Sequence, residues 1–256
     1  MVKKVVTVMN YPDRTNENIM CITWMKKTRE HFPNDFKIEI LYEKNISNLI
    51  KKYAKKFNIT LKKADRSHEI DFTGHPDCIK ASHNVNFKLY NLCKLNDSFI
   101  FLDADAFILH SSDDLIEASK TKEFIAVNHQ NIPGQTDMLS EPVLNSGVMV
   151  INNTDLFNWD IFKKILFRDK KFVYPGTDQS LINSRFKEDN IDYTHTNIGF
   201  GWNSWSKYTV WENNKAFCKG LEKEHPVFIN HYWNEAKPWN INCPVYNDSM
   251  KEVFLE

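Results

Sequence analysis

Apolar residues form two alternating patterns along roughly the first three quarters of the chain. Short continuous runs of β-branched and aromatic residues are typical of strands buried on both faces. They predict strands at Val5–Met9, Phe99–Leu102, Phe124–Val127 and Val148–Ile151, and the period-two pattern of Lys37–Tyr42 predicts a further strand. Apolar positions three or four residues apart predict helices at Asn16–Arg29, Ile46–Phe57, Asn84–Leu95, Asp155–Arg168 and Thr177–Arg185. This alternation predicts an α/β protein with a mostly parallel central sheet and helices on both faces.

The sequence after about residue 190 is aromatic and shows no regular period, so we expect irregular structure there. The chain has no internal repeat, low-complexity linker or shift in composition that would mark a boundary. A chain of 256 residues can form one large α/β domain, and we expect a single domain over residues 1–256.

Composition excludes several classes of protein. Lys and Arg together number 33, as do Asp and Glu, so bulk charge gives no reason to expect nucleic-acid binding. No apolar run reaches the roughly 18 residues that a transmembrane helix needs, and the N-terminus lacks a long apolar leader. The five cysteines are scattered and form no Cys-x-x-Cys pair. We therefore expect a cytoplasmic protein without a transmembrane segment.

Two acids interrupt the most apolar segment of the chain. Asp103 and Asp105 directly follow the strand predicted at Phe99–Leu102. In extended geometry, residues two apart point the same way and can meet on one cation. A hard divalent ion takes one or two protein carboxylates and completes its shell with phosphate oxygens. The pair therefore indicates a nucleotide-diphosphate site, although aspartates also serve as turn and cap residues.

Three further segments turn this motif into a specific pattern. They are Asn145-Ser146-Gly147 before a strand, Asp178-Gln179 at a helix start, and His231 six residues before Lys237-Pro238-Trp239. Together with Asp103-Ala104-Asp105, in this order and at these separations, the segments resemble the glycogenin-like retaining glycosyltransferases of family 8. The resemblance extends over about residues 5 to 240 and implies the GT-A fold, a Rossmann-like architecture for nucleotide-diphospho-sugar transferases.

The resemblance implies a metal site and a chemistry for it. Asp103, Asp105 and His231 would hold a divalent cation that stabilises charge on the leaving diphosphate. Imidazole is an ordinary ligand for Mn²⁺ and an unusual one for Mg²⁺, so Mn²⁺ is the expected cofactor and Mg²⁺ the alternative. Taken alone, His231 would be interpreted as a structural histidine.

The resemblance also assigns the remaining site residues. Lys237 would place a positive charge on the diphosphate, and Asp178 and Gln179 would lie beside the transferred sugar. The residues expected to bind the nucleotide-sugar donor, which is expected to be UDP-glucose or a related UDP-hexose, are Thr7, Asn10, Tyr11, Lys88, Asp103, Ala104, Asn145, Ser146 and Asn234. Without the family pattern, Asn-Ser-Gly would be interpreted as a turn, and Asp178 as an acid in the first turn of a helix.

Two positions depart from the family pattern. Asn234 stands where the family has a glycine in its phosphate loop, and asparagine tolerates positive φ better than most residues. Pro175 replaces an extra acid found in glycogenin, which weakens the case for self-glucosylation. Two mechanisms can retain the anomeric configuration of the transferred sugar, namely double displacement and front-face attack. The poor nucleophilicity of the Gln179 amide favours front-face attack.

The sequence therefore predicts a metal-dependent retaining glycosyltransferase that moves a hexose from a UDP-sugar to an unknown glycan, protein or small-molecule acceptor. One alternative is a non-catalytic sugar- or nucleotide-binding module on a transferase scaffold. A haloacid-dehalogenase-like phosphatase is a second alternative, but that class normally needs a Thr or Val two positions after the second acid, whereas Ala106 and Phe107 follow Asp105 here. A homodimer is a candidate assembly.

Overall fold

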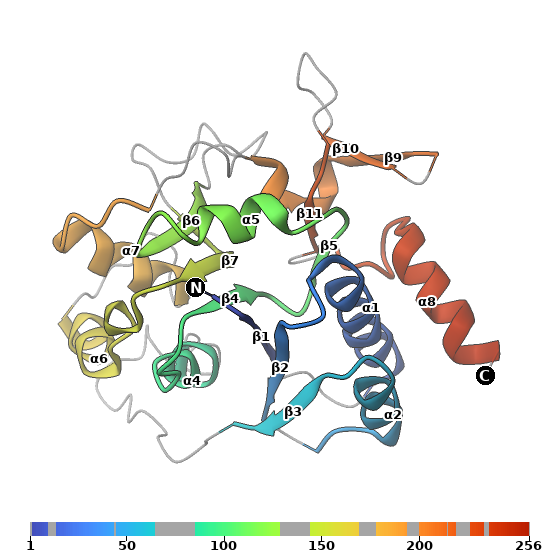
Figure 1. The fold of residues 1–256 in the computed structure, drawn as a ribbon, viewed down its shortest axis with the longest axis horizontal. Coiled ribbons are helices and arrows are strands. Elements are labelled where there is room, and N and C mark those ends of the chain that lie inside the picture. The colour runs from blue at the N-terminus through green and yellow to red at the C-terminus, as the bar shows by residue number, and fades with distance from the viewer. Residues whose placement is uncertain are drawn as a thin grey trace.

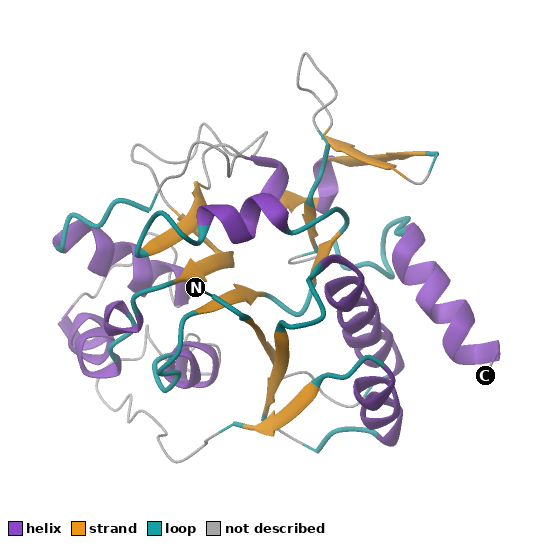
Figure 2. Cartoon of the chain, viewed as in Figure 1, coloured by secondary structure: helices purple, strands orange, loops and turns teal. Residues whose placement is uncertain are grey.

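The computed structural model, drawn in Figures 1 and 2, describes most of the chain. The described residues are 2–9, 14–43, 45–64, 85–128, 144–168, 178–193, 200–213, 215–218, 226–232 and 236–255. Within these ranges, no helix combines the length and the apolar character needed to cross a bilayer.

A six-stranded sheet forms the centre of the molecule. Its strands lie in the order β3 (Thr60–Lys63), β2 (Lys37–Tyr42), β1 (Lys4–Met9), β4 (Phe99–Leu102), β7 (Leu144–Ile151) and β6 (Phe124–Asn128). The pairs β3–β2, β2–β1 and β1–β4 are parallel, whereas β7 runs antiparallel to both of its neighbours. The prediction of a mostly parallel sheet is confirmed, with one reversed strand.

Helices cover both faces of this sheet (Figure 1). One face carries α1 (Thr15–His31), α2 (Asn48–Lys56) and α5 (Asp113–Ala118), and α8 (Pro244–Leu255) packs against the outer side of α1 (Figure 1). The other carries a π-helical turn (Val85–Leu89) that continues into α4 (Tyr90–Leu92), followed by α6 (Trp159–Arg168) and α7 (Asp178–Glu188). In β4, Ile100 and Leu102 pack with the first group, and Phe99 and Phe101 with the second. Burial on both faces explains why the sequence shows an unbroken apolar run here.

A second, smaller sheet lies at the end of the main one. Its order is β5 (Ala106–Ile108), β11 (Ile229–His231) and β8 (Ser204–Trp205). β11 pairs antiparallel with β5 and parallel with β8. A hairpin of β9 (Thr209–Glu212) and β10 (Lys215–Cys218) follows β8, and 3₁₀ turns occur at Thr154–Leu156, Phe200–Asn203 and Ser206–Tyr208.

The differences from the sequence predictions concern short or polar elements. β3, α5, α8, the second sheet and the β9–β10 hairpin were not predicted, so the expectation of irregular structure after residue 190 was wrong. β7 begins at Leu144, which places Asn145-Ser146-Gly147 inside a strand and not before one. Residues Asn84 and Thr177 lie outside the described part of the chain.

Candidate active site

The two aspartates leave β4 in a turn. The backbone N–H of Ala106 donates to the carbonyl of Asp103 at 2.9 Å, which closes a tight turn between β4 and β5. The backbone N–H of Asp103 donates to the carbonyl of Gly147 at 2.8 Å, which fixes the turn to β7. The expectation that Asp103 and Asp105 follow extended geometry was wrong, because residues 103–106 form a turn. The turn nevertheless places both carboxylates on the same side.

His231 reaches the same point from the second sheet. It pairs with Ala106 in the β5–β11 ladder, and the backbone N–H of Tyr232 donates to the carbonyl of Asp105 at 2.9 Å. These contacts hold the end of β11 directly against the aspartate turn. Main-chain hydrogen bonds therefore position a histidine that is remote in sequence.

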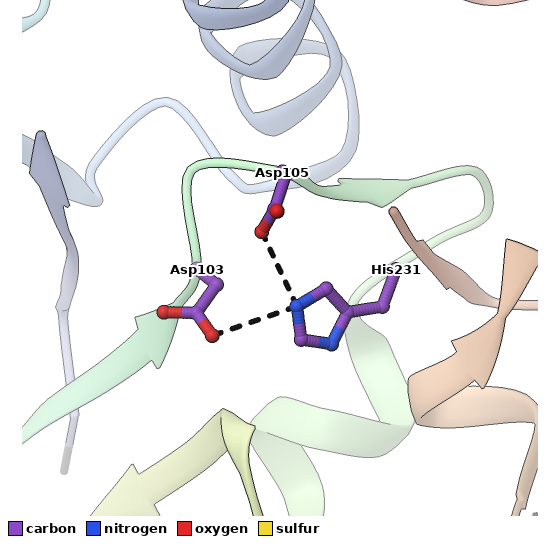
Figure 3. Close-up of side chains that lie close together, drawn as sticks. All are labelled: Asp103, Asp105 and His231. Atoms are coloured by element: carbon purple, nitrogen blue, oxygen red, sulfur yellow. Dashed lines mark ion pairs between the residues drawn. The ribbon is translucent and has the colours of Figure 1, made fainter. Parts of the chain in front are cut away.

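The three side chains converge on one point, as Figure 3 shows. The imidazole Nε2 of His231 lies 3.2 Å from Oδ1 of Asp105 and 3.5 Å from Oδ2 of Asp103. Ligand atoms from all three residues lie within 4.8 Å of one another. His231 and Asp105 are buried, and the side chain of Asp103 is 26 % exposed, so the cluster opens on the Asp103 side.

These donors fit a six-coordinate divalent cation. Metal–ligand bonds of about 2.1 Å place neighbouring ligand atoms of an octahedron about 3 Å apart and opposite ones about 4.2 Å apart. The observed separations of 3.2 and 3.5 Å are close to the first value. Two carboxylates with one imidazole suit Mn²⁺ by donor type and leave coordination positions for other ligands.

Lys237 supplies positive charge beside the cluster. Its ammonium group forms an ion pair with Oδ2 of Asp105. Burial alone would raise the pKa of Asp105, but the adjacent His231 and the ammonium of Lys237 hold that pKa well below its usual range. Asp103 differs, because loss of solvent around its carboxyl raises its pKa and Lys88 offsets this only partly. The carboxylate of Asp105 is therefore the more firmly ionised of the two.

Lys88 joins the aspartate turn to α7. Its Nζ lies 2.8 Å from Oδ1 of Asp103 and 2.8 Å from Oδ2 of Asp178, and it donates to the carbonyl of Ser146 at 3.2 Å. The ammonium also lies over the ring of Phe101. Burial favours the neutral amine, yet the two carboxylates outweigh it and raise the pKa of Lys88 above its ordinary value. Lys88 is thus a fixed, buried positive charge between the two acids.

Strand β7 and helix α7 bring the remaining predicted residues to this place. The amide of Asn183 bonds both the N–H and the carbonyl of Leu144, which docks α7 against the start of β7. As a result, Oε1 of Gln179 accepts from the backbone N–H of Ser146 at 3.3 Å. Asp178, Gln179 and Ser146 therefore lie together around Lys88, on the Asp103 side of the cluster.

Two further residues contact His231 and were not among the predicted site residues. Asn203, at the end of the 3₁₀ turn Phe200–Asn203, lies with its Oδ1 2.9 Å from Nδ1 of His231. The imidazole also lies against Gly147, where an added Cβ would be 2.1 Å from Cε1 of the ring. Gly147 was visible as part of the Asn-Ser-Gly motif, whereas nothing in the aromatic segment around Asn203 indicated a role.

The other predicted donor-binding residues are placed as follows. Thr7 lies in β1 one residue after Val6, which pairs with Phe101, and its buried Oγ1 has no hydrogen-bond partner in the described structure. Ala104 is buried within the aspartate turn. Asn10, Tyr11 and Asn234, together with Pro175, lie outside the described residues. The donor-binding roles of all these residues stay predictions.

One known protein family has a model that matches nearly the whole chain. The family model described as "Glycosyl transferase family 8" matches residues 6–243. The chain belongs to glycosyl transferase family 8. This membership supports glycosyl transfer as its activity and confirms the resemblance predicted from the four motifs. A search of curated proteins finds no match.

Solved structures agree with the family 8 assignment. An active-site variant of LgtC aligns with a TM-score of 0.67 and 17% identity over 97% of this chain and 95% of that one. The galactosyltransferase LgtC in complex with donor and acceptor sugar analogues aligns with a TM-score of 0.63 and 16% identity over 98% and 95%. Apo GlyE from Streptococcus pneumoniae aligns with a TM-score of 0.62 and 16% identity over 100% and 61%. These similarities show that this family 8 member has the GT-A fold.

Proposed function

We propose that this chain is a metal-dependent, retaining hexosyltransferase that uses a UDP-sugar donor, with residues 1–256 forming one catalytic domain. The observation that carries the proposal is the convergence of Asp103, Asp105 and His231 within 4.8 Å at the end of the central sheet. Open α/β sheets bind their ligands at this edge, where the strands end. Family 8 membership and the GT-A fold support the same reaction class.

Charge around the cluster supports a cationic ligand. Three carboxylates, those of Asp103, Asp105 and Asp178, face the ammonium groups of Lys88 and Lys237 in the described structure. Among these groups the carboxylates outnumber the ammonium groups by one, and two of the acids are buried. Bound at Asp103, Asp105 and His231, Mn²⁺ would neutralise charge on the leaving diphosphate. Mg²⁺ is the alternative ion.

Lys237 is the residue we assign to the leaving group. Its ammonium contacts Asp105 and its side chain is 22% exposed, so the charge lies at the mouth of the cluster and not within it. An ammonium here can stabilise phosphate oxygens as the glycosidic bond breaks, because charge on those oxygens grows toward the transition state. Lys237 would therefore act in catalysis as well as in binding.

Asp178 and Gln179 are the residues we assign to the sugar. Asp178 is buried and held by Lys88, and the Gln179 side chain is engaged by the backbone of Ser146. A carboxylate fixed in this way can stabilise positive charge at the anomeric carbon, and an amide is a poor covalent nucleophile. The poor nucleophilicity of the Gln179 amide favours front-face attack over double displacement. Asn145 and Ser146 would contribute to the donor-sugar site.

The donor class is supported by a structural neighbour. LgtC is a galactosyltransferase that was solved with donor and acceptor sugar analogues, and its fold aligns with nearly all of this chain. We propose a UDP-hexose, such as UDP-glucose or UDP-galactose, as the donor here. The acceptor would be a glycan, a protein or a small molecule.

A turnover assay tests the proposal directly. Purified protein would be incubated with UDP-glucose or UDP-galactose, with Mn²⁺ or with EDTA, and UDP release would be measured. We expect turnover with Mn²⁺ only, and a loss in Asp103→Asn larger than the roughly 10–100-fold typical of changes to outer-shell residues. Asp114→Asn, an exposed acid at the start of α5, is the matched control and should retain activity.

Two outcomes would contradict the proposal. Equal UDP release by wild type and Asp103→Asn would remove the metal role. Tight UDP-sugar binding without UDP release, over a panel of acceptor sugars, would favour a non-catalytic binding module. The anomeric configuration of the product, determined by NMR, tests retention separately.

A further inference from the structure

A chain of hydrogen bonds runs from the backbone of β7 to the ring of His231. The N–H of Gly147 donates to Oδ1 of Asn145 at 2.8 Å, and Nδ2 of Asn203 donates to the same oxygen at 2.7 Å. Oδ1 of Asn203 then lies 2.9 Å from Nδ1 of His231. Asn145, Asn203 and His231 are all at least nine-tenths buried, so water does not compete for these contacts.

The hydrogen bond from the N–H of Gly147 to Asn145 fixes the direction of the two that follow it. A backbone N–H can only donate, so the Asn145 atom that it meets must be the carbonyl oxygen. Because that oxygen accepts, Asn203 must turn its NH₂ group toward Asn145. The oxygen of Asn203 therefore faces His231, and Nδ1 of the imidazole must carry a proton to donate to it. Nε2 is left as the nitrogen that can offer a lone pair.

The aspartates by themselves would favour the opposite tautomer. Carboxylates only accept hydrogen bonds, so Asp103 and Asp105 beside Nε2 would attract a proton to that nitrogen. A neutral imidazole protonated at Nε2 has no lone pair to give to a metal at this position. Asn203 opposes this preference, because its oxygen requires a proton on Nδ1. This requirement is the same for a neutral ring and for a ring that also carries a proton on Nε2 before an ion binds.

We propose that Asn203 is a positioning residue that sets the tautomer and orientation of His231 for metal binding. The proposal rests on the metal site of the proposed function. It also gives Asn145 a structural role besides the predicted contact with the donor sugar. The 3₁₀ turn that carries Asn203 leads into β8, whose Trp205 pairs with His231 along the backbone, so the same sheet fixes both partners. Outer-shell hydrogen bonds of this kind orient ligating histidines and strengthen their donation.

The test compares two substitutions of one residue. Asn203→Leu removes the acceptor for the Nδ1 proton, whereas Asn203→Asp retains one. Histidine labelled with ¹⁵N would report the protonation of each ring nitrogen in the metal-free protein, with His231 assigned from the signal missing in His231→Gln. The affinity for Mn²⁺ would be measured from the electron paramagnetic resonance of the free ion. Asn152→Leu removes an amide that follows β7 and donates to the carbonyls of Ser119 and Lys122, at the opposite end of the strand from Asn145, and is the matched control.

We expect Nδ1–H in wild type, in Asn203→Asp and in the control, and a shift toward Nε2–H in Asn203→Leu. Mn²⁺ affinity should fall roughly 10–100-fold in Asn203→Leu and stay within about threefold in the control. It should fall less in Asn203→Asp than in Asn203→Leu, because the aspartate keeps the acceptor for Nδ1–H and loses only the donor to Oδ1 of Asn145. Should Asn203→Leu fail to fold, Asn203→Ser replaces it, because a hydroxyl donates or accepts and imposes no direction.

Some results would overturn the inference and leave the proposed function intact. One is a folded Asn203→Leu variant that keeps Nδ1–H and wild-type Mn²⁺ affinity. Another is an Asn203→Asp variant that loses as much affinity as Asn203→Leu. If wild type itself binds no Mn²⁺, the metal site of the proposed function fails, while the ¹⁵N measurement still decides whether Asn203 sets the tautomer.

Discussion

Gly147 allows a sharp test of the active-site geometry. An added Cβ at this position would lie 2.1 Å from Cε1 and 2.5 Å from Nδ1 of His231. An ordinary contact begins at about 3.4 Å, so in Gly147→Ala the ring must retreat by about 1.3 Å or β7 must shift. Residue 147 must therefore be a glycine, because the imidazole of His231 occupies the space that a Cβ would fill.

The expected size of the effect follows from this displacement. Forcing one extra methyl group into a packed site costs about 1–3 kcal/mol of unfolding free energy. A misplacement of about 1 Å at a catalytic group can lower the rate roughly 100-fold. We therefore expect Gly147→Ala to lower Mn²⁺-dependent turnover by about that factor and to weaken Mn²⁺ binding.

A double-mutant cycle separates the collision from other effects. In His231→Ala the imidazole is gone, and the nearest contact given for the added methyl group is then Oδ1 of Asn145 at 3.0 Å. Gly147→Ala should therefore destabilise this background by less than it destabilises wild type. Urea denaturation of the four proteins measures this coupling without relying on activity. An equal loss of stability in both backgrounds, or unchanged Mn²⁺ affinity in Gly147→Ala, would refute the reasoning.

Three other substitutions have defined outcomes. Lys237→Ala should lower kcat more than it weakens UDP-sugar binding, because the proposed function assigns its charge to the departing diphosphate; steady-state kinetics with a separate binding measurement would show equal losses if Lys237 only binds. Lys88→Met should cost about 3–5 kcal/mol in urea denaturation, since it leaves two carboxylates without their shared cation; a loss below about 1 kcal/mol would contradict this. Phe107→Ala should cost about 3–5 kcal/mol, because this ring is fully buried, whereas exposed Phe254→Ala should change stability by less than about 0.5 kcal/mol; calorimetry that gave similar changes for both would argue against the packing described.

The sequence predicted the central sheet well because burial on both faces leaves a clear signal. β2 and β4 have the predicted bounds, and β1 and β6 differ by one residue. β7 was predicted to begin at Val148, but it begins at Leu144. Its first part carries small and polar side chains that serve the site, and these residues mask the apolar pattern of a strand.

The second sheet was not predictable by the same reasoning. β5, β8 and β11 contain three, two and three residues, too few to show a period. These strands also pair with segments distant in sequence, so the residues next to each strand do not predict the pairing. The meeting of His231 with the aspartates could be expected only from the resemblance to family 8.

Among the site residues, chemistry was easier to predict than geometry. Asp103 and Asp105 could be chosen by residue type and spacing, and His231 and Lys237 by the resemblance to family 8. The structure brings these four residues together. The contact of Lys88 with both Asp103 and Asp178 was not predicted, because it depends on how α7 docks against β7. Asn203 was missed because a hydrogen bond to a ring nitrogen leaves no trace in a sequence pattern.

The pairing of β5 with β11 has a consequence for how the protein matures. Lys237 and Asp105 are 132 residues apart along the chain, and contacts so distant in sequence form slowly. A chain still growing on the ribosome displays both aspartates long before His231 and Lys237 have been synthesised. The nascent protein therefore carries the two acids without their imidazole partner, and the cluster of three side chains exists only in the finished fold.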